Sequence, residues 1–173
     1  MTVRNAVAYD HRLSKTLALL TQPGLLLAAT RRNGESNVMA IGWATVGTAW
    51  GRPIFQVMVR PSRYTYELLE ESGEFTVNVP TGAMRDWVTV CGTRSGRDFD
   101  KIGASGVAVS RGQGVATITL DESPMVYECR VVHRNDVLSP NLDPEIAASA
   151  YAGGDYHRVY WGEIVGAYAT ADY

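Results

Sequence analysis

Residues 53–73 read PIFQVMVRPSRYTYELLEESG. The apolar run 53–59 predicts a buried strand, and the following segment 66–73 predicts a short amphipathic helix that ends at a glycine. The turn between them holds two arginines and two hydroxyl side chains, namely Arg60, Ser62, Arg63 and Thr65. The free N–H groups and the positive dipole end of a helix at this point favour an anion, and phosphate is the obvious candidate. The alternative is an ordinary helix start, in which Thr65 caps the first turn and the arginines are solvated.

A second polar segment, residues 91–101, reads CGTRSGRDFDK. It is short of large apolar residues although it lies inside a compact chain, and it carries hydroxyls, three cations and two glycines. Loops of this kind often hold ligands, and the backbone amides together with Lys101 could bind a phosphate. The alternative is a solvated connecting loop.

The rest of the chain predicts a mainly β fold with short peripheral helices. A helical lead-in over residues 1–24 is expected, and the pattern predicts a second helix over 84–90. An Asn-Gly hairpin turn is expected at 32–35. Strands are predicted at 25–30, 37–45, 75–79, 115–120, 125–133 and 159–169. Frequent turns without repeating βαβ units favour a barrel over a doubly wound sheet.

Length and composition indicate one domain over residues 1–173. The 173 residues are 46% hydrophobic and 20% charged, which is typical of a soluble globular protein with a real core. The formal net charge of −2 gives no electrostatic case for nucleic acid or an anionic membrane, and no apolar run is long enough to span a bilayer. The two cysteines make no disulfide framework, and no signal-peptide pattern follows the first residues, so we expect a cytoplasmic protein.

A search for catalytic motifs mostly excludes reaction classes. The chain has no G-x-G-x-x-G dinucleotide motif after a strand, no P-loop and no G-x-S-x-G nucleophile elbow. The three histidines show no metal-ligand spacing, so no metal site is expected. Since no pair of carboxylates is placed as an acid and a base, an enzyme with this sequence needs a cofactor for its chemistry.

Six segments in order give the chain a family resemblance. They are residues 37–44, NVMAIGWA; 60–66, RPSRYTY; 75–80, FTVNVP; 95–101, SGRDFDK; 124–129, PMVYEC; and His157 with Gly162-Glu163-Ile164. In this order and spacing the chain, from about Leu25 to Ala169, resembles the flavin reductase-like proteins of the flavoredoxin branch. The resemblance implies an FMN-binding split β-barrel of Greek-key type.

The resemblance also implies site residues. Asn37 and Trp43 match positions beside the isoalloxazine ring, Met39 and Ala40 would offer backbone contacts to its edge, and Thr45 lies just beyond. The phosphate and ribityl chain would be held by Ser62, Arg63, Tyr64 and Thr65 and by the second loop with Ser95, Gly96, Arg97 and Lys101. His157 matches a histidine near the reactive face of the flavin; no catalytic residue is assigned, because the flavin carries the chemistry.

Each of these residues also has a purely structural interpretation. Trp43 could be a core aromatic, Asn37 the closing residue of a hairpin, and His157 a surface residue. Tyr64 could be a packing residue. Cys91 is expected near the site, without any argument for a reactive thiolate.

Residues 134–155 depart from the family pattern, because they form a long connection before the last strand. Residues 143–148 predict a short capped helix with proline at its first position. We expect this insertion to cover part of the flavin or of a dimer interface. The chain also ends soon after the last strand, where many relatives continue, so contacts from such a tail are expected to be missing or replaced.

The resemblance implies a homodimer and an FMN-dependent oxidoreductase. The expected activity is that of an NAD(P)H-dependent flavin reductase or a flavoredoxin-like electron-transfer protein, with NADH or NADPH as donor and a small molecule or a redox protein as acceptor. The alternatives are a specialised FMN enzyme that reduces one small organic substrate, or a non-catalytic split barrel that binds FMN or another ligand.

Overall fold

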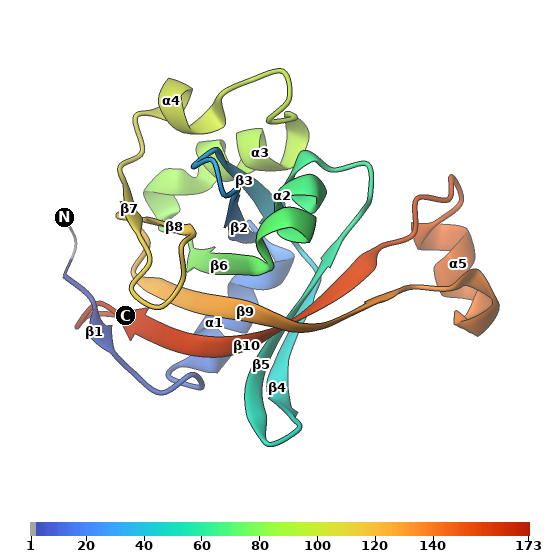
Figure 1. The fold of residues 1–173 in the computed structure, drawn as a ribbon, viewed down its shortest axis with the longest axis horizontal. Coiled ribbons are helices and arrows are strands. Elements are labelled where there is room, and N and C mark those ends of the chain that lie inside the picture. Colours follow the sequence, from blue (N-terminus) through green and yellow to red (C-terminus); the bar gives the residue numbers. More distant parts are fainter. Residues whose placement is uncertain (1–2) are drawn as a thin grey trace.

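The computed structural model of the chain describes residues 3–173. One large antiparallel sheet dominates, in the strand order β3-β2-β6-β9-β10-β5-β4, with β1 paired to β10 and a separate β7–β8 hairpin (Figure 1). The strands are β1 (Asn5–Ala6), β2 (Leu25–Thr30), β3 (Ser36–Ile41), β4 (Ala44–Ala49), β5 (Arg52–Val59), β6 (Glu74–Val79), β7 (Val109–Arg111), β8 (Ile118–Leu120), β9 (Met125–Asp136) and β10 (Arg158–Ala169). The mainly β fold predicted from the sequence is confirmed.

Residues 3–173 contain five short α-helices: α1 (Leu13–Thr21), α2 (Tyr64–Ser72), α3 (Arg85–Thr93), α4 (Lys101–Ser105) and α5 (Pro144–Ala150). Helix α2 ends as predicted, because Gly73 adopts a left-handed conformation and its N–H bonds to Leu69 O. None of the helices within residues 3–173 has the length and apolarity needed to cross a bilayer.

The sheet encloses the main core. Its strands contribute apolar side chains that are fully buried, including Leu25, Leu27, Phe55, Val57, Phe75, Val77, Tyr127 and Tyr160. The opposite face of β2 is also covered, because Leu26 and Ala28 pack against Met84, Val88 and Cys91. This second cluster fixes α3 beside β2 and β3, so the loop that follows α3 is delivered to the edge of the sheet.

Two of the predicted strands differ from the structure. The segment 37–45 is not one strand, because the sheet pairing breaks at Gly42 and Trp43 and the chain leaves β3 to form a hairpin of β4 with β5. The segment 115–120 is ordered as a strand only from Ile118, because the amides before it bond to side chains. Gln113 N and Gly114 N donate to the Glu128 carboxylate, and Ala116 N donates to that of Glu74.

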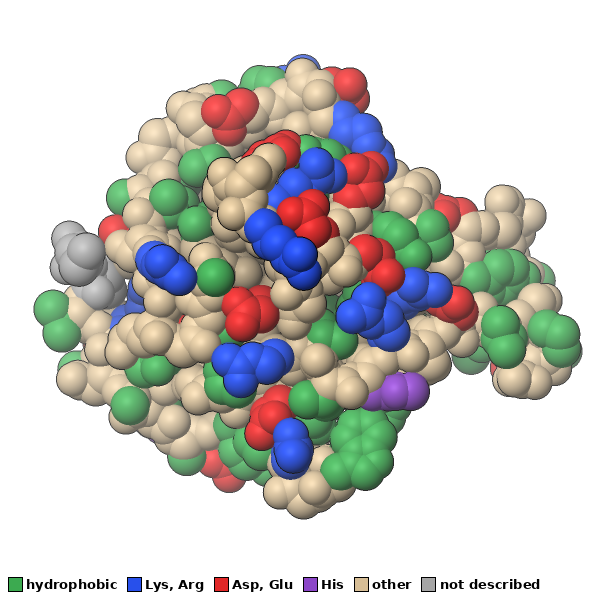
Figure 2. Space-filling view, in the orientation of Figure 1, with side chains coloured by type: hydrophobic (Ala, Val, Ile, Leu, Met, Phe, Trp, Pro, Cys, Tyr) green, Lys and Arg blue, Asp and Glu red, His purple; other side chains and the backbone are tan. Residues whose placement is uncertain are grey.

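The connection between β9 and β10, residues 137–157, is called the arm, and its helical part projects to one side of the molecule (Figure 1). Its helix α5 is the capped helix predicted from the sequence: Asp143 accepts from Glu145 N and Ile146 N, and Pro144 is at the first position. No residue of α5 is buried, and Leu138 and Ile146 of the arm are about half exposed at 56% and 49%. Hydrophobic side chains are accordingly prominent on this part of the surface (Figure 2).

Candidate functional site

A cavity of about 470 Å³ lies where β3, the start of α2, the loop after α3 and the end of the arm meet. A volume of this size is typical of small-molecule sites. The cavity brings together almost every site residue predicted from the sequence: Asn37, Met39, Ala40, Trp43, Ser62, Arg63, Tyr64, Thr65, Ser95, Gly96, Arg97, Lys101 and His157.

Thr45 is the exception. It lies on β4, beyond the break at Trp43, and is not among the residues that line the cavity. Its hydroxyl donates to Gln56 Oε1 across the β4–β5 pair at 2.6 Å. Thr45 was expected on the same strand as Asn37, beside the ligand. The chain instead turns at Gly42 and Trp43, so Thr45 belongs to a different strand from Asn37.

The charge of the cavity lining is strongly positive. Four arginines and one lysine line it, namely Arg60, Arg63, Arg94, Arg97 and Lys101, against one carboxylate, Asp98. Lys101 is 4% exposed, and within residues 3–173 no carboxylate lies at ion-pair distance from its ammonium. Burial lowers the pKa of Lys101, since a buried ammonium without a partner favours its neutral form. An anionic ligand at this point would restore the missing partner.

The first turn of α2 opens into the same cavity without a side-chain cap. Arg63 is the N-cap residue, and no side chain bonds to the free amides of the turn. Thr65 lies inside the helix instead of capping it, and its hydroxyl accepts from Asn37 Nδ2 at 2.8 Å. The ordinary-cap interpretation of Thr65 is therefore wrong. The free amides and the Thr65 hydroxyl proton remain available to an anion.

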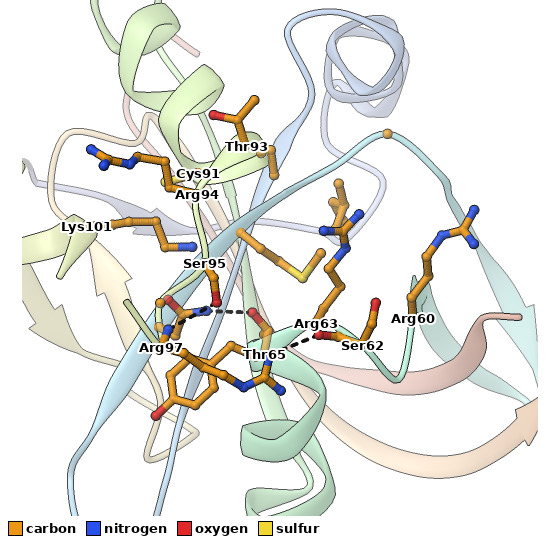
Figure 3. Close-up of a pocket in the computed structure, with 18 of the residues that line it drawn as sticks. Arg60, Ser62, Arg63, Thr65, Cys91, Thr93, Arg94, Ser95, Arg97 and Lys101 are labelled. Carbon is orange, nitrogen blue, oxygen red and sulfur yellow. Dashed lines mark hydrogen bonds between the residues drawn. The ribbon is translucent and has the colours of Figure 1, made fainter. Parts of the chain in front are cut away.

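Lys101, Ser95 and Thr65 point into one region of the cavity from three different elements (Figure 3). The loop that carries Ser95 lies directly against β3: a Cβ added at Gly96 would be 2.3 Å from Asn37 Oδ1 and 2.8 Å from Tyr64 Cδ1. Only a glycine permits this close approach of the backbone. The polar loop predicted at 91–101 is therefore part of the cavity wall, although its first residues, up to Thr93, belong to α3.

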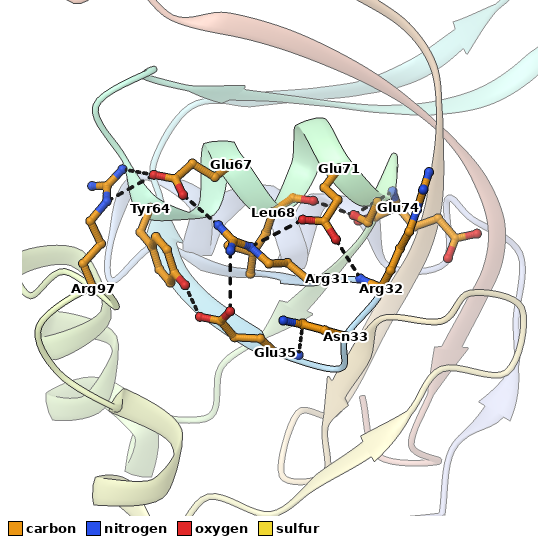
Figure 4. Close-up of polar contacts among 11 residues, drawn as sticks. Arg31, Arg32, Asn33, Glu35, Tyr64, Glu67, Leu68, Glu71, Glu74 and Arg97 are labelled. Carbon is orange, nitrogen blue, oxygen red and sulfur yellow. Dashed lines mark hydrogen bonds and ion pairs between the residues drawn. The ribbon is translucent and has the colours of Figure 1, made fainter.

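A network of ion pairs fastens this loop to α2 (Figure 4). Arg97 pairs with Glu67 and donates to Ser62 O at 3.0 Å, while Arg31 donates to Glu67 at 2.7 Å. Charged side chains of both signs alternate over this part of the surface (Figure 2). The pairing lowers the pKa of Glu67 and neutralises the one acidic side chain in the first turn of α2, which keeps the helix start attractive to anions.

Two predicted phosphate contacts have other partners in this network. The Arg97 guanidinium is engaged by Glu67 and Ser62, so it fastens the loop rather than pointing as a free cation into the cavity. The Tyr64 hydroxyl donates to Glu35 outside the cavity, and the Arg97 guanidinium lies 5.3 Å from its ring. Tyr64 lines the cavity with its ring, and its hydroxyl points away from the cavity toward Glu35. This arrangement agrees with the interpretation of Tyr64 as a packing residue.

At the other end, the cavity mouth is formed by Trp43, His157 and Arg60. The rings of Trp43 and His157 lie 5.0 Å apart, and Trp43 is 46% exposed, so it is not a core aromatic. Arg60 fastens the arm here by donating to Ala150 O and Asp155 O, both at 2.8 Å. Burial, with the charges of Arg60 and Arg63, lowers the pKa of His157 to about 4, so the imidazole is neutral at pH 7.

The outer edge of β3 completes the cavity. β3 is the last strand of the sheet, so half of its main-chain groups have no neighbouring strand to pair with. Met39 and Ala40 on this strand line the cavity, where such groups can meet a ligand. The backbone contacts to a ligand expected at these two positions stay a prediction.

Some residues of the site were not predicted from the sequence. Met58 faces the cavity from β5, and Arg94 and Thr93 do so from the end of α3. Arg94 is one of the three cations of the polar segment 91–101, and this was the feature of the sequence that could have identified it as a site residue. Tyr151 and Asp155 come from the arm and contact His157 and Ser62, and no sequence motif marks them. Cys91 lines the cavity as expected, and burial raises the pKa of its thiol to about 12, so it stays protonated.

Comparisons with known proteins agree with this geometry. A family model described as "Flavin reductase like domain" matches residues 17–172. The flavoredoxin of Methanosarcina acetivorans is 29% identical, with a TM-score of 0.67 over 87% of this chain and 70% of that chain. An FMN-binding domain of a flavin reductases-like enzyme from Shewanella baltica OS155 is 24% identical, with a TM-score of 0.68 over 97% of this chain and 78% of that chain. The split-barrel fold is thereby confirmed.

Among curated relatives, an uncharacterized protein of Escherichia coli (strain K12), YddH, is 29% identical over 109 residues. The match covers 62% of this chain and 57% of the E. coli protein. The chain thus matches a little over half the length of this relative.

Proposed function

Because the chain belongs to the flavin reductase-like domain family, we propose that it is an FMN-dependent oxidoreductase that takes electrons from NADH or NADPH. Bound FMN would supply the hydride- and electron-transfer chemistry, and the protein would supply binding, orientation and electrostatics. The names of two structural neighbours, a flavoredoxin and an FMN-binding domain, support this choice of cofactor.

The observation that carries the proposal is Lys101, a buried ammonium that has no carboxylate partner within residues 3–173. The cavity lining around it also holds Arg60, Arg63 and Arg94, against one carboxylate, Asp98. A phosphate dianion fits this environment, because it accepts several hydrogen bonds and neutralises buried positive charge. Lys101, the Ser95 and Thr65 hydroxyls and the first amides of α2 would hold the phosphate. These donors come from separate elements that the Arg97–Glu67 pair keeps together.

The ring of the cofactor would then extend toward the cavity mouth. The edge groups of Met39 and Ala40 would hydrogen-bond its polar edge, and the exposed Trp43 ring would pack beside it. His157 is neutral, so it adds a hydrogen-bond donor at the mouth without adding charge. The arm would cover the mouth on one side and exclude water there, since Arg60, at the start of the strand-to-helix turn, donates to Ala150 O and Asp155 O of the arm.

The test is a visible absorption spectrum of the purified protein after incubation with FMN, repeated anaerobically with NADH and then with NADPH. We expect a bound-flavin spectrum that bleaches with one of the two donors. A protein that binds no FMN would contradict the cofactor assignment. A bound flavin that neither nucleotide reduces would contradict the reductase and favour the flavoredoxin-like electron carrier.

The homodimer implied by the resemblance remains a prediction, and analytical ultracentrifugation of the FMN-loaded protein tests it. We expect a mass of twice 18.9 kDa. A single 18.9 kDa species at micromolar concentration would contradict it.

A further inference from the structure

Tyr151, at the end of α5, is a buried aromatic residue of the arm whose hydroxyl has one side-chain hydrogen-bond partner within residues 3–173. It is 5% exposed, and its hydroxyl lies 2.8 Å from His157 Nδ1. Its ring is stacked on that of Tyr156 with centroids 4.7 Å apart, and the Arg60 guanidinium lies 5.0 Å from its centroid. The hydroxyl is therefore held at a fixed position beside the histidine.

The chemistry of the pair sets the direction of this hydrogen bond. A neutral imidazole carries its proton on one ring nitrogen, and the other nitrogen accepts. The phenol is the stronger acid and the imidazole nitrogen the stronger base, so Tyr151 donates and Nδ1 accepts. Burial raises the pKa of Tyr151, which keeps its proton in place, and His157 is neutral for the reason given above. The imidazole proton is therefore on Nε2.

Nε2 is the nitrogen left for a ligand. Within residues 3–173 it has no hydrogen-bond partner, and His157 lines the cavity mouth. The groups that face His157 are the Trp43 ring, the positive charges of Arg60 and Arg63, and the carboxylate of Asp155, which is already engaged by the Ser62 hydroxyl and amide. The mouth thus combines a flat apolar face, one N–H donor and excess positive charge.

Resting on the proposed function, we propose that Tyr151 is a positioning residue that holds His157 as an Nε2–H donor at the cavity mouth, where the second substrate is a planar organic compound with an anionic oxygen. Its ring would lie on the part of the Trp43 side chain that the flavin leaves exposed, and its oxygen would accept from Nε2 in the field of Arg60 and Arg63. The arm would in this way determine which substrates are accepted, because it supplies Tyr151.

The first experiment measures the His157 tautomer by ¹⁵N NMR of the imidazole in the cofactor-free protein. Tyr151→Phe removes the donor, and Tyr156→Phe is the matched control, because its hydroxyl has no hydrogen bond within residues 3–173. We expect a single Nε2–H tautomer in the wild type and in Tyr156→Phe, and a mixture of tautomers in Tyr151→Phe. An unchanged tautomer in Tyr151→Phe would overturn the positioning role, whether or not the protein binds FMN.

The second experiment titrates the FMN-loaded protein with benzoate and follows the flavin absorption spectrum. We expect benzoate to bind, and Tyr151→Phe to weaken its affinity by about the factor by which the Nε2–H fraction falls in the first experiment, because only that tautomer donates to the ligand. FMN affinity should stay within about twofold in Tyr156→Phe, because Tyr156 does not line the cavity. Equal benzoate affinity in Tyr151→Phe and wild type, or no benzoate binding to a protein that does bind FMN, would overturn the substrate class. Failure to bind FMN at all would instead contradict the proposed function, and the tautomer experiment would still decide the role of Tyr151.

Discussion

Lys101→Met tests the phosphate end of the site, because methionine keeps most of the side-chain volume and removes the charge. Lys101 is 4% exposed and has no carboxylate partner within residues 3–173, so its ammonium is free to bond the phosphate of FMN. A hydrogen bond to a charged group contributes about 1.5–3 kcal/mol. The expected loss of FMN affinity is therefore about 10- to 150-fold.

The assay is a titration of apoprotein into FMN, followed by quenching of the flavin fluorescence. Arg85→Ala is the control, because Arg85 is an exposed cation on α3 that does not line the cavity, and it should leave the affinity within about twofold. Raising the salt concentration should weaken binding to the wild type more than binding to Lys101→Met, since part of the attraction is electrostatic. Equal FMN affinity in Lys101→Met and wild type would refute the assignment of the phosphate to this end of the cavity.

Three further results are expected. In the cofactor-free protein, Lys101→Met should raise the melting temperature at pH 7, because burial lowers the pKa of Lys101 below its usual 10.5 and the charged side chain therefore destabilises the fold. This gain in melting temperature should shrink as the pH rises toward 10.5, where the wild-type lysine becomes neutral. A variant that melts at a lower temperature than the wild type at pH 7 would contradict this prediction. Gly96→Ala should weaken FMN binding by roughly tenfold, because its Cβ would lie 2.3 Å from Asn37 Oδ1. Gly153→Ala is the control and should leave FMN binding unchanged, because a Cβ there would meet open space. Fluorescence titration of both variants with FMN tests this prediction. The pKa of His157 is about 4 in the folded protein and 6.5 when unperturbed, so the unfolded chain binds the extra proton and the free energy of unfolding falls as the pH drops from about 6.5 to 4. In urea unfolding, His157→Gln should lose less of this free energy than the wild type over the same pH range. Parallel plots of unfolding free energy against pH for the two proteins would contradict this explanation.

The sequence predicted much of the fold because its strands alternate clearly and are separated by turn residues. The hairpin turn at Gly34 and the end of α2 at Gly73 formed where glycine was required, since both adopt positive φ values. The strand predicted over 37–45 was too long, because Gly42 and Trp43 are compatible with an extended strand and only tertiary pairing shows that the chain changes partners there.

The site was predicted in outline from the resemblance, and the structure places nearly all of its residues around one cavity. What the sequence could not give is how side chains divide their hydrogen bonds. Thr65 matches a helix cap in sequence but bonds Asn37, and Arg97 counts as a loop cation but pairs with Glu67. Both partners are distant along the chain, so no local pattern reveals them. Tyr151 depends on how the arm folds back, which local propensity does not determine.

The most direct test of the account is a crystal structure of the protein with FMN. We expect a phosphate oxygen within hydrogen-bond distance of Lys101 Nζ and of the first amides of α2, with the flavin ring beside Trp43 and His157. A flavin bound with its phosphate at the cavity mouth, or bound outside this cavity, would contradict it.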